Sequence, residues 1–186
     1  MTRMDVLKLK AVVLYIINKR GEIDFMHLFK ILYFAERSQY AEYGQHLIKD
    51  SFCALQNGPV PSFLYDAVKH VTNRPSCQHD YLDIITSAIE PVGGECDYVL
   101  KAKEAPDMTF LSEAEIEAID LAYSQNIDKN FDDLSNSSHD EAWHEAWGAA
   151  ENSPMCSLSI AKAGGASSGF LKYIAENEEL EQIIAG

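Results

Sequence analysis

The stretch from Phe25 to Pro61 constrains the fold more than any other part of the chain. It joins a dense apolar segment, a glycine, a short alternating segment and an Asn-Gly-Pro sequence. Apolar residues in its first part recur at spacings of three and four, the period of an α-helix. The stripe is wide enough to be buried on most sides, so it predicts a central core helix. The residues of the stripe are Phe25, Leu28, Phe29, Leu32, Tyr33 and Ala35.

Two polar residues, His27 and Lys30, stand inside this apolar helix. A charged side chain in such surroundings either extends its amine to the edge of the core or meets a specific partner. Both interpretations are open for Lys30. Before the core helix we expect another helix over Asp5–Asn18. Asp24 is suited to cap the core helix, which reaches about Ser38 and, after a continuation, stops at Gly44.

Strand signals occur in two places. Ser51–Gln56 alternates weakly between apolar and polar residues and predicts a short strand, and Asn57-Gly58-Pro59 after it is a turn signal. Tyr81–Val92 is rich in isoleucine, and Tyr98-Val99-Leu100 follows it. These two segments predict a hairpin with Gly93-Gly94 in its turn.

Helix signals occupy the rest of the chain. A helix over Ser62–Val71 begins with Pro61 in its first turn. Ser112–Glu115 and Ser138–Glu141 each match a capping box, in which a serine and a glutamate three residues later satisfy backbone donors. Gly164-Gly165 separates two further helices. The chain is therefore predicted to be α+β and predominantly α-helical, with six to seven helices around the core helix and a small antiparallel sheet or hairpin.

The formal net charge of −14 limits the class of partner. A field of this sign repels nucleic acid and anionic membranes and favours a protein with a basic surface. The alternative is that acidity simply keeps the protein soluble. We find no signal peptide and no apolar run long enough for a membrane span, so we expect a cytoplasmic protein that contacts neither membrane nor nucleic acid.

Chemical motifs are few. Cys77-x-His79-Asp80 contains three kinds of metal ligand, but it lacks a second ligand pair at metal-site spacing. A Cys–His nucleophile pair stays open, because such residues meet in space rather than in sequence. No phosphate-binding loop, no GxSxG and no HExxH is present. We therefore expect no catalytic residue, no cofactor and no metal, and a protein that is not an enzyme.

Two features near the C-terminus point to binding. Ile160 to Ile174 fits two helices around a small-residue turn, with Ser167 capping the second, as in a helix-turn-helix. The second helix is acidic, however, whereas a DNA-reading helix needs basic or amide side chains. His139, Trp143 and Trp147 fall on one helical face and form either core or a protein-binding surface.

The order of these motifs resembles the Panacea domain, found in SocA-like antitoxins and phage-associated proteins. The family marks are a K-L-x-Y-x-A helix, a glycine, a strand ending in G-P-V, a helix carrying an aromatic residue, and a later Ser-His…Trp signature. In this chain they match Lys30, Leu32, Tyr33, Ala35, Gly44, Gly58, Pro59, Val60, Tyr65, Ser138, His139 and Trp143. The resemblance covers residues 5–150, and we expect residues 151–186 to form a C-terminal helical extension on the same domain.

The resemblance implies an antitoxin encoded beside the gene of its cognate toxin, which it neutralises by direct protein–protein binding. Some members instead deliver the toxin to a Clp-type protease, and this role stays open. The alternative from a different class is a DNA-binding transcriptional regulator that uses the tail helices. Lys30, Tyr33, Gly58, Pro59, His139 and Trp143 are interpreted as mainly fold-defining, with toxin contact as the alternative for Lys30.

Overall fold

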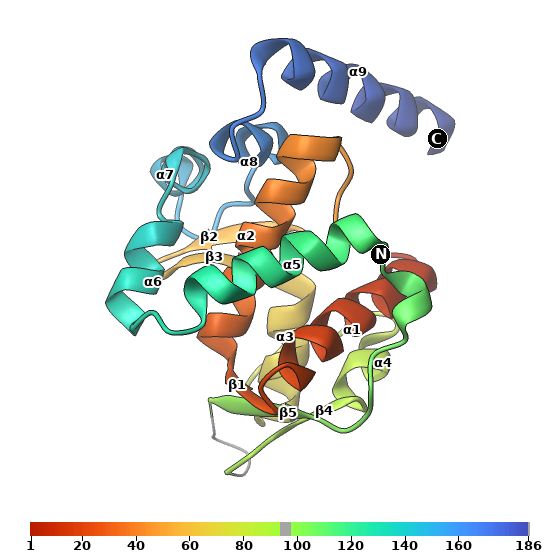
Figure 1. Cartoon of the computed structure of the whole chain (residues 1–186), viewed down its shortest axis with the longest axis vertical. Coiled ribbons are helices and arrows are strands. Elements are labelled where there is room, and N and C mark those ends of the chain that lie inside the picture. The colour runs from red at the N-terminus through yellow and green to blue at the C-terminus, as the bar shows by residue number, and fades with distance from the viewer. Residues whose placement is uncertain (94–97, 186) are drawn as a thin grey trace.

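The computed structural model describes residues 1–93 and 98–185, with side chains up to residue 180. Helix α2 (Phe25–Tyr43) runs through the middle of the molecule (Figure 1). Asp24 caps it by accepting a hydrogen bond from His27 N at 3.0 Å, and Gly44 ends it in the left-handed conformation at φ +65°. The prediction of a central core helix is confirmed, together with its continuation to the glycine.

Helix α1 (Arg3–Asn18) and a three-stranded antiparallel sheet pack below α2. The strands are β1 (Glu22–Asp24), β4 (Ile89–Pro91) and β5 (Val99–Ala102), in the order β1-β5-β4. The predicted pairing of the last two strands is confirmed, and Gly94 of the predicted turn lies outside the described residues. Leu82–Thr86 was predicted as an extended arm, which is wrong: it forms the short helix α4. Leu82 and Ile85, three positions apart, are both buried by that helix.

A second sheet is the hairpin of β2 (Phe52–Leu55) and β3 (Gly58–Pro61). The prediction that Gly58 and Pro59 form the turn is wrong. Gly58 pairs opposite Leu55 and begins a strand, so the loop consists of the two residues between them. Glycine is needed at this strand start because φ is +98°.

Helix α3 (Ser62–Val71) has its predicted limits, but Pro61 precedes it instead of lying in its first turn. The free N–H groups of Phe63 and Leu64 are taken by the Asp50 carboxylate, at 2.9 and 3.0 Å. Burial raises the pKa of Asp50 to about 6. A carboxylate that is distant in sequence therefore does the work of a local cap.

Helices α5 (Glu113–Asn126), α6 (Phe131–Ser138) and α7 (Glu141–Ala149) follow a 3-10 turn over Met108–Phe110. The capping box at the start of α5 is confirmed. The one predicted at Ser138 is wrong, because Ser138 ends α6 and donates its hydroxyl to the Ser135 carbonyl at 2.7 Å. Asp140 caps α7 instead, accepting a hydrogen bond from Trp143 N at 3.1 Å. A carboxylate one residue before the helix thus replaces the serine.

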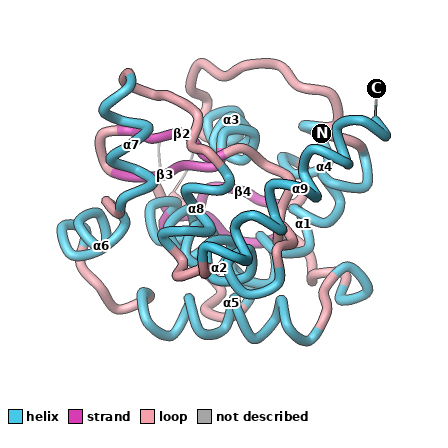
Figure 2. The backbone as a smooth tube through the Cα atoms, turned by 90° about the horizontal axis from the view of Figure 1, so that it is seen from above, coloured by secondary structure: helices cyan, strands magenta, loops and turns pink. Residues whose placement is uncertain are grey.

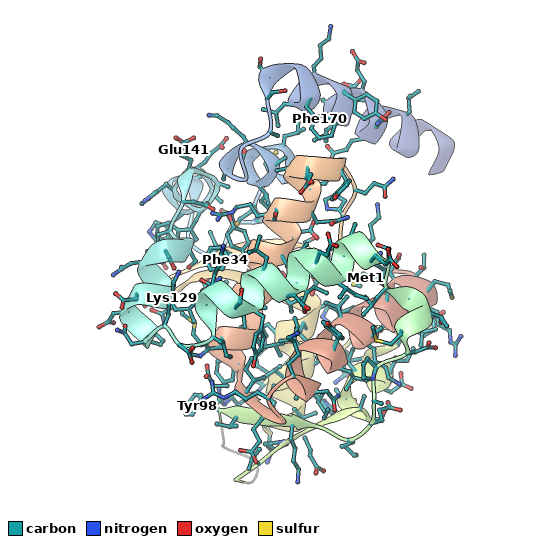
Figure 3. All side chains as sticks on the ribbon, viewed as in Figure 1. Met1, Phe34, Tyr98, Lys129, Glu141 and Phe170 are labelled. Atoms are coloured by element: carbon teal, nitrogen blue, oxygen red, sulfur yellow. The ribbon has the colours of Figure 1, made fainter. Side chains whose placement is uncertain are left out.

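The tail forms α8 (Ser157–Ala163) and α9 (Ser168–Ala185), with Ser167 capping α9 as predicted. Both lie against the C-terminal end of α2 (Figure 2). Phe170 lies beneath α9 and, with Ile174, packs on Gly44 (Figure 3). Among the described side chains of α9, the exposed large apolar ones are Tyr173 and Leu180. The exposed charged ones are one lysine, Lys172, and two glutamates, Glu176 and Glu179. This predominantly acidic surface gives no support to the DNA-binding alternative, since a DNA-reading helix presents basic or amide side chains to the bases.

The predicted fold class, α+β and predominantly α-helical, is confirmed. Nine α-helices and two small antiparallel sheets lie within the described residues, against six to seven helices predicted. The short helices α4 and α6 account for the difference. No helix in the described part of the chain combines the length and the apolar character that crossing a membrane requires.

Candidate functional site

Lys30 is the most unusual residue of the core. Its side chain is fully buried, and its Nζ donates a hydrogen bond to the Pro59 carbonyl at 2.8 Å. Burial lowers the pKa of this amine to about 7. Of the two interpretations of Lys30, extension to the edge is wrong and a specific partner is confirmed. The Gly58 backbone lies directly against the amine, since a Cβ there would be 3.0 Å from Nζ.

The buried amine makes a prediction about stability and pH. The free energy of unfolding rises with pH wherever the unfolded chain binds more protons than the folded chain. An amine with a pKa of about 7 when folded and 10.5 when unfolded meets this condition between those values. Relative to Lys30→Met, we expect the wild type to gain about 1.4 kcal/mol of unfolding free energy per pH unit. Urea denaturation of both proteins at pH 7.5, 8.5 and 9.5 measures it.

The control for this experiment is Lys172→Met, at an exposed lysine of α9. Its unfolding free energy is expected to stay parallel to that of the wild type across the three pH values, because this side chain is exposed to solvent in the folded protein as well as in the unfolded chain. Methionine retains the unbranched length of lysine in both variants. A difference between the wild type and Lys30→Met that does not change with pH would contradict a lowered pKa.

Tyr33 and Arg37, one turn apart on α2, converge on one carboxylate. The Tyr33 hydroxyl donates to Asp140 Oδ2 at 2.7 Å, and Arg37 Nη1 donates to the same oxygen at 2.8 Å. Burial and the neighbouring Asp140 carboxylate raise the pKa of Tyr33 well above its usual range. Because Asp140 also caps α7, this carboxylate ties α2 to α7.

An aromatic column continues from this carboxylate. The His139 ring stacks on Trp143 at 3.8 Å between centroids, and Trp143 stacks on Trp147 at 5.3 Å. Trp143 is 6% exposed, and its Nε1 donates to the Leu55 carbonyl at 2.9 Å. Burial and the nearby Lys30 lower the pKa of His139. The prediction that these three rings share one helical face is wrong for His139, which lies between α6 and α7, although its ring still stacks on the Trp143 ring of α7. Trp143 belongs to the core.

The structure thus brings seven motif residues into one buried cluster between α2, the β2–β3 hairpin and the segment that joins α6 to α7. They are Lys30, Tyr33, Gly58, Pro59, Ser138, His139 and Trp143. Three other motif residues lie elsewhere: Gly44 packs under α9, Val60 is buried in β3, and Tyr65 meets Phe29 edge-on at 5.9 Å. Most of the cluster is buried, so it acts on a partner mainly through the surface that it supports.

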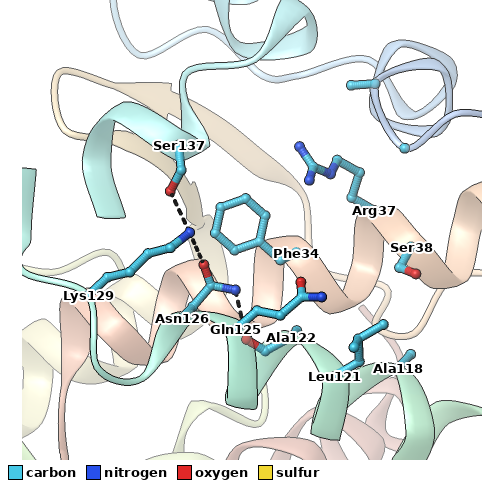
Figure 4. A pocket seen from close by; sticks show the side chains of 12 residues that line it. Phe34, Arg37, Ser38, Ala118, Leu121, Ala122, Gln125, Asn126, Lys129 and Ser137 are labelled. Carbon is cyan, nitrogen blue, oxygen red and sulfur yellow. Dashed lines mark hydrogen bonds between the residues drawn. The ribbon is translucent and has the colours of Figure 1, made fainter. Parts of the chain in front are cut away.

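A pocket of about 260 Å³ opens next to this cluster, between α2, α5, α6 and the end of α8 (Figure 4). Phe34 lies in it, and the polar ends of Arg37, Lys129 and Ser137 surround the ring. Lys129 Nζ donates to Asn126 Oδ1 at 2.8 Å and to Ser137 Oγ at 3.3 Å. Because Ser137 precedes the last residue of α6, one wall of the pocket is continuous with the buried cluster.

Sequence reasoning did not single out Arg37, Asp140 or Lys129. Arg37 follows Tyr33 by four residues, so the helical period offered a signal for the first of them. Asp140 follows His139 directly, but the supposed serine cap obscured its role. No local signal marks Lys129, because the pocket forms only where α5 and α6 both pack on α2.

The Cys77-x-His79-Asp80 motif has a different arrangement from a metal site. His79 Nε2 is 2.7 Å from Asp66 Oδ2, and Cys77 N donates to Asp66 Oδ1 at 3.3 Å. Lys69 also pairs with Asp66. The contacts hold the loop after α3 against that helix. Among the side chains that the structure describes, no three or more His, Cys, Asp or Glu residues form a group that could hold a metal ion.

Comparison with known proteins gives one finding. The family model described as antitoxin SocA-like, Panacea domain, matches residues 28–144, which is more than half of the chain. The matched segment runs from the first turn of α2 to α7 and contains the whole buried cluster. No curated protein and no solved structure gives a significant match.

Proposed function

Because the chain belongs to the family of SocA-like antitoxins with a Panacea domain, we propose that it neutralises a cognate toxin by direct protein–protein binding. The family match carries this proposal. The net charge of −14 supports it, because an acidic protein associates rapidly with a basic partner and covers its surface. In this proposal the protein acts in the cytoplasm and is not an enzyme.

We infer the domain organisation from the same match. Residues 5–150 form the Panacea domain in this proposal, and residues 151–186 are a helical extension packed on it. Helix α8 contacts α2 and α7, and α9 contacts α8 and the end of α2. The Tyr40 hydroxyl in α2 donates to Glu178 Oε1 at 2.5 Å, which adds a polar contact to the apolar packing of the extension.

Co-expression with the product of the neighbouring gene tests the proposed function. We expect the neighbouring gene alone to arrest growth and this chain to restore it. The two proteins should also co-purify as a stoichiometric complex. A harmless neighbour, or toxicity that this chain leaves unchanged, would refute an antitoxin role for this pair.

Direct neutralisation and delivery to a protease give different results in the same experiment. If binding alone neutralises the toxin, growth is restored equally in a host that lacks the Clp-type protease. If the chain is an adaptor, that host stays arrested although the two proteins still bind. The level of toxin, measured by immunoblot in both hosts, is expected to stay constant for direct neutralisation and to fall only in the protease-containing host for delivery.

A further inference from the structure

The pocket beside Phe34 differs in charge from the rest of the protein. The chain contains 29 acidic and 15 basic residues, yet none of the twelve residues lining this pocket is acidic, and two are basic. The lining residues are Phe34, Arg37, Ser38, Ala118, Leu121, Ala122, Gln125, Asn126, Lys129, Ser137, Ala163 and Gly164. On a strongly acidic molecule, this lining makes a local positive site.

The two cations lie on either side of the Phe34 ring. The Arg37 guanidinium is 4.9 Å from the ring centroid, and Lys129 Nζ is 5.7 Å from it. The hydrogen-bond partners of Lys129 within the described residues, Asn126 and Ser137, are both neutral. No carboxylate in that part of the chain therefore neutralises this amine.

Arg37 keeps donors for a ligand. Its bond to Asp140 uses one of the five N–H groups of the guanidinium. The Asp140 carboxylate is shared, because it also accepts hydrogen bonds from the Tyr33 hydroxyl and from Trp143 N. These contacts hold the guanidinium at the pocket without saturating it. A planar guanidinium fixed in this way is suited to a carboxylate.

The rest of the lining suits a peptide. Leu121 is 52% exposed at the pocket, and three alanines leave apolar surface beside it. The Gln125 side chain is exposed at the same edge. A volume of about 260 Å³ holds one or two side chains and is smaller than the usual pocket for a drug-sized molecule.

We propose that this pocket binds the carboxylate of a glutamate or aspartate side chain of a partner polypeptide, with a neighbouring apolar residue of that polypeptide against Leu121. The identification of this polypeptide as the toxin rests on the proposed function. One acidic residue entering a positive pocket on an otherwise acidic surface fixes the register in which a basic partner docks. The rest of the acidic surface attracts the partner without selecting a single orientation.

A titration with small peptides tests the site in the isolated full-length protein. The probes are acetyl-Leu-Glu-amide, its neutral equivalent acetyl-Leu-Gln-amide, and inorganic phosphate, followed by the backbone amide signals of the ¹⁵N-labelled protein. We expect the glutamate peptide to shift signals of residues 121–129 and 137 saturably, with roughly tenfold weaker binding of the glutamine peptide. Lys129→Met should weaken binding of the glutamate peptide by about the same factor as the change from the glutamate to the glutamine peptide. Lys172→Met should leave binding of the glutamate peptide unchanged.

Three outcomes would overturn the proposal. They are equal binding of the two peptides, shifts confined to other parts of the chain, and phosphate acting on the same signals at lower concentration than the glutamate peptide. The last outcome would assign the pocket to a phosphate group. Co-expression of the toxin with the Lys129→Met or the Lys172→Met variant then tests whether the toxin uses the pocket. Full restoration of growth by the Lys129→Met variant would show that the toxin does not use it. If the neighbouring gene is harmless, the proposed function fails, but the titration still decides the chemistry of the pocket.

Discussion

Replacing Trp143 with alanine is expected to lower the free energy of unfolding by about 3–5 kcal/mol, because it removes a large buried aromatic side chain and leaves a cavity. The ring is 6% exposed and lies between His139 and Trp147. Its loss also leaves the Leu55 carbonyl without the indole donor at 2.9 Å. Urea denaturation followed by circular dichroism measures the change.

Two variants separate packing from hydrogen bonding at this position. Trp143→Phe keeps an aromatic ring but removes the donor to Leu55, so we expect a smaller loss of about 1–3 kcal/mol. Trp147→Ala removes the half-buried neighbouring ring and should cost less than Trp143→Ala. A loss under about 1 kcal/mol for Trp143→Ala would show that the ring contributes little to the core.

The second large effect is expected at Gly58. A Cβ at this position would collide with the Ser138 hydroxyl and lie 3.0 Å from Cε and Nζ of Lys30. The residue also has φ +98°, a backbone conformation that residues other than glycine rarely adopt. Strain of about 1–2 kcal/mol and overpacking of about 1–3 kcal/mol add up, so Gly58→Ala should lose roughly 2–5 kcal/mol of unfolding free energy.

Gly165→Ala is the matched control. Its φ is +97°, almost the same, but a Cβ there would meet nothing within 4 Å. It should therefore show the conformational strain without the collision. The difference in unfolding free energy between the two variants, measured from their denaturation curves, gives the cost of the collision with the buried cluster. Equal losses would mean that backbone strain alone requires glycine at position 58 and that the cluster can relax around a methyl group.

These two experiments also bear on the proposed binding site. The buried cluster holds the end of α6 and the start of α7, and Ser137 and the partner of Arg37 come from these segments. A variant that loosens the cluster should therefore weaken binding at the pocket even where the fold persists. Lys129→Met should weaken binding without a comparable loss of stability, because Lys129 is only half-buried.

The sequence by itself determined much of the local structure of this protein, above all the ends of its helices. The limits of α2, its cap at Asp24 and its stop at Gly44 follow from apolar spacing and from residues close in the chain, and so does the capping box of α5. Family membership also followed from the order of short motifs. Where local signals competed, the prediction was wrong: Ser138 matched a capping box, but Asp140 is the residue that caps α7.

Only the tertiary structure decided the partners of the unusual residues. Lys30 and Pro59 are 29 residues apart, and Tyr33 and Asp140 are 107 apart. The lowered pKa of Lys30 and the collision at Gly58 exist only after these segments pack. The positive pocket likewise requires α2, α5, α6 and the end of α8 to meet. The physical reason is that helical period and capping act over a few residues, whereas burial and charge pairing depend on which distant segments exclude water together.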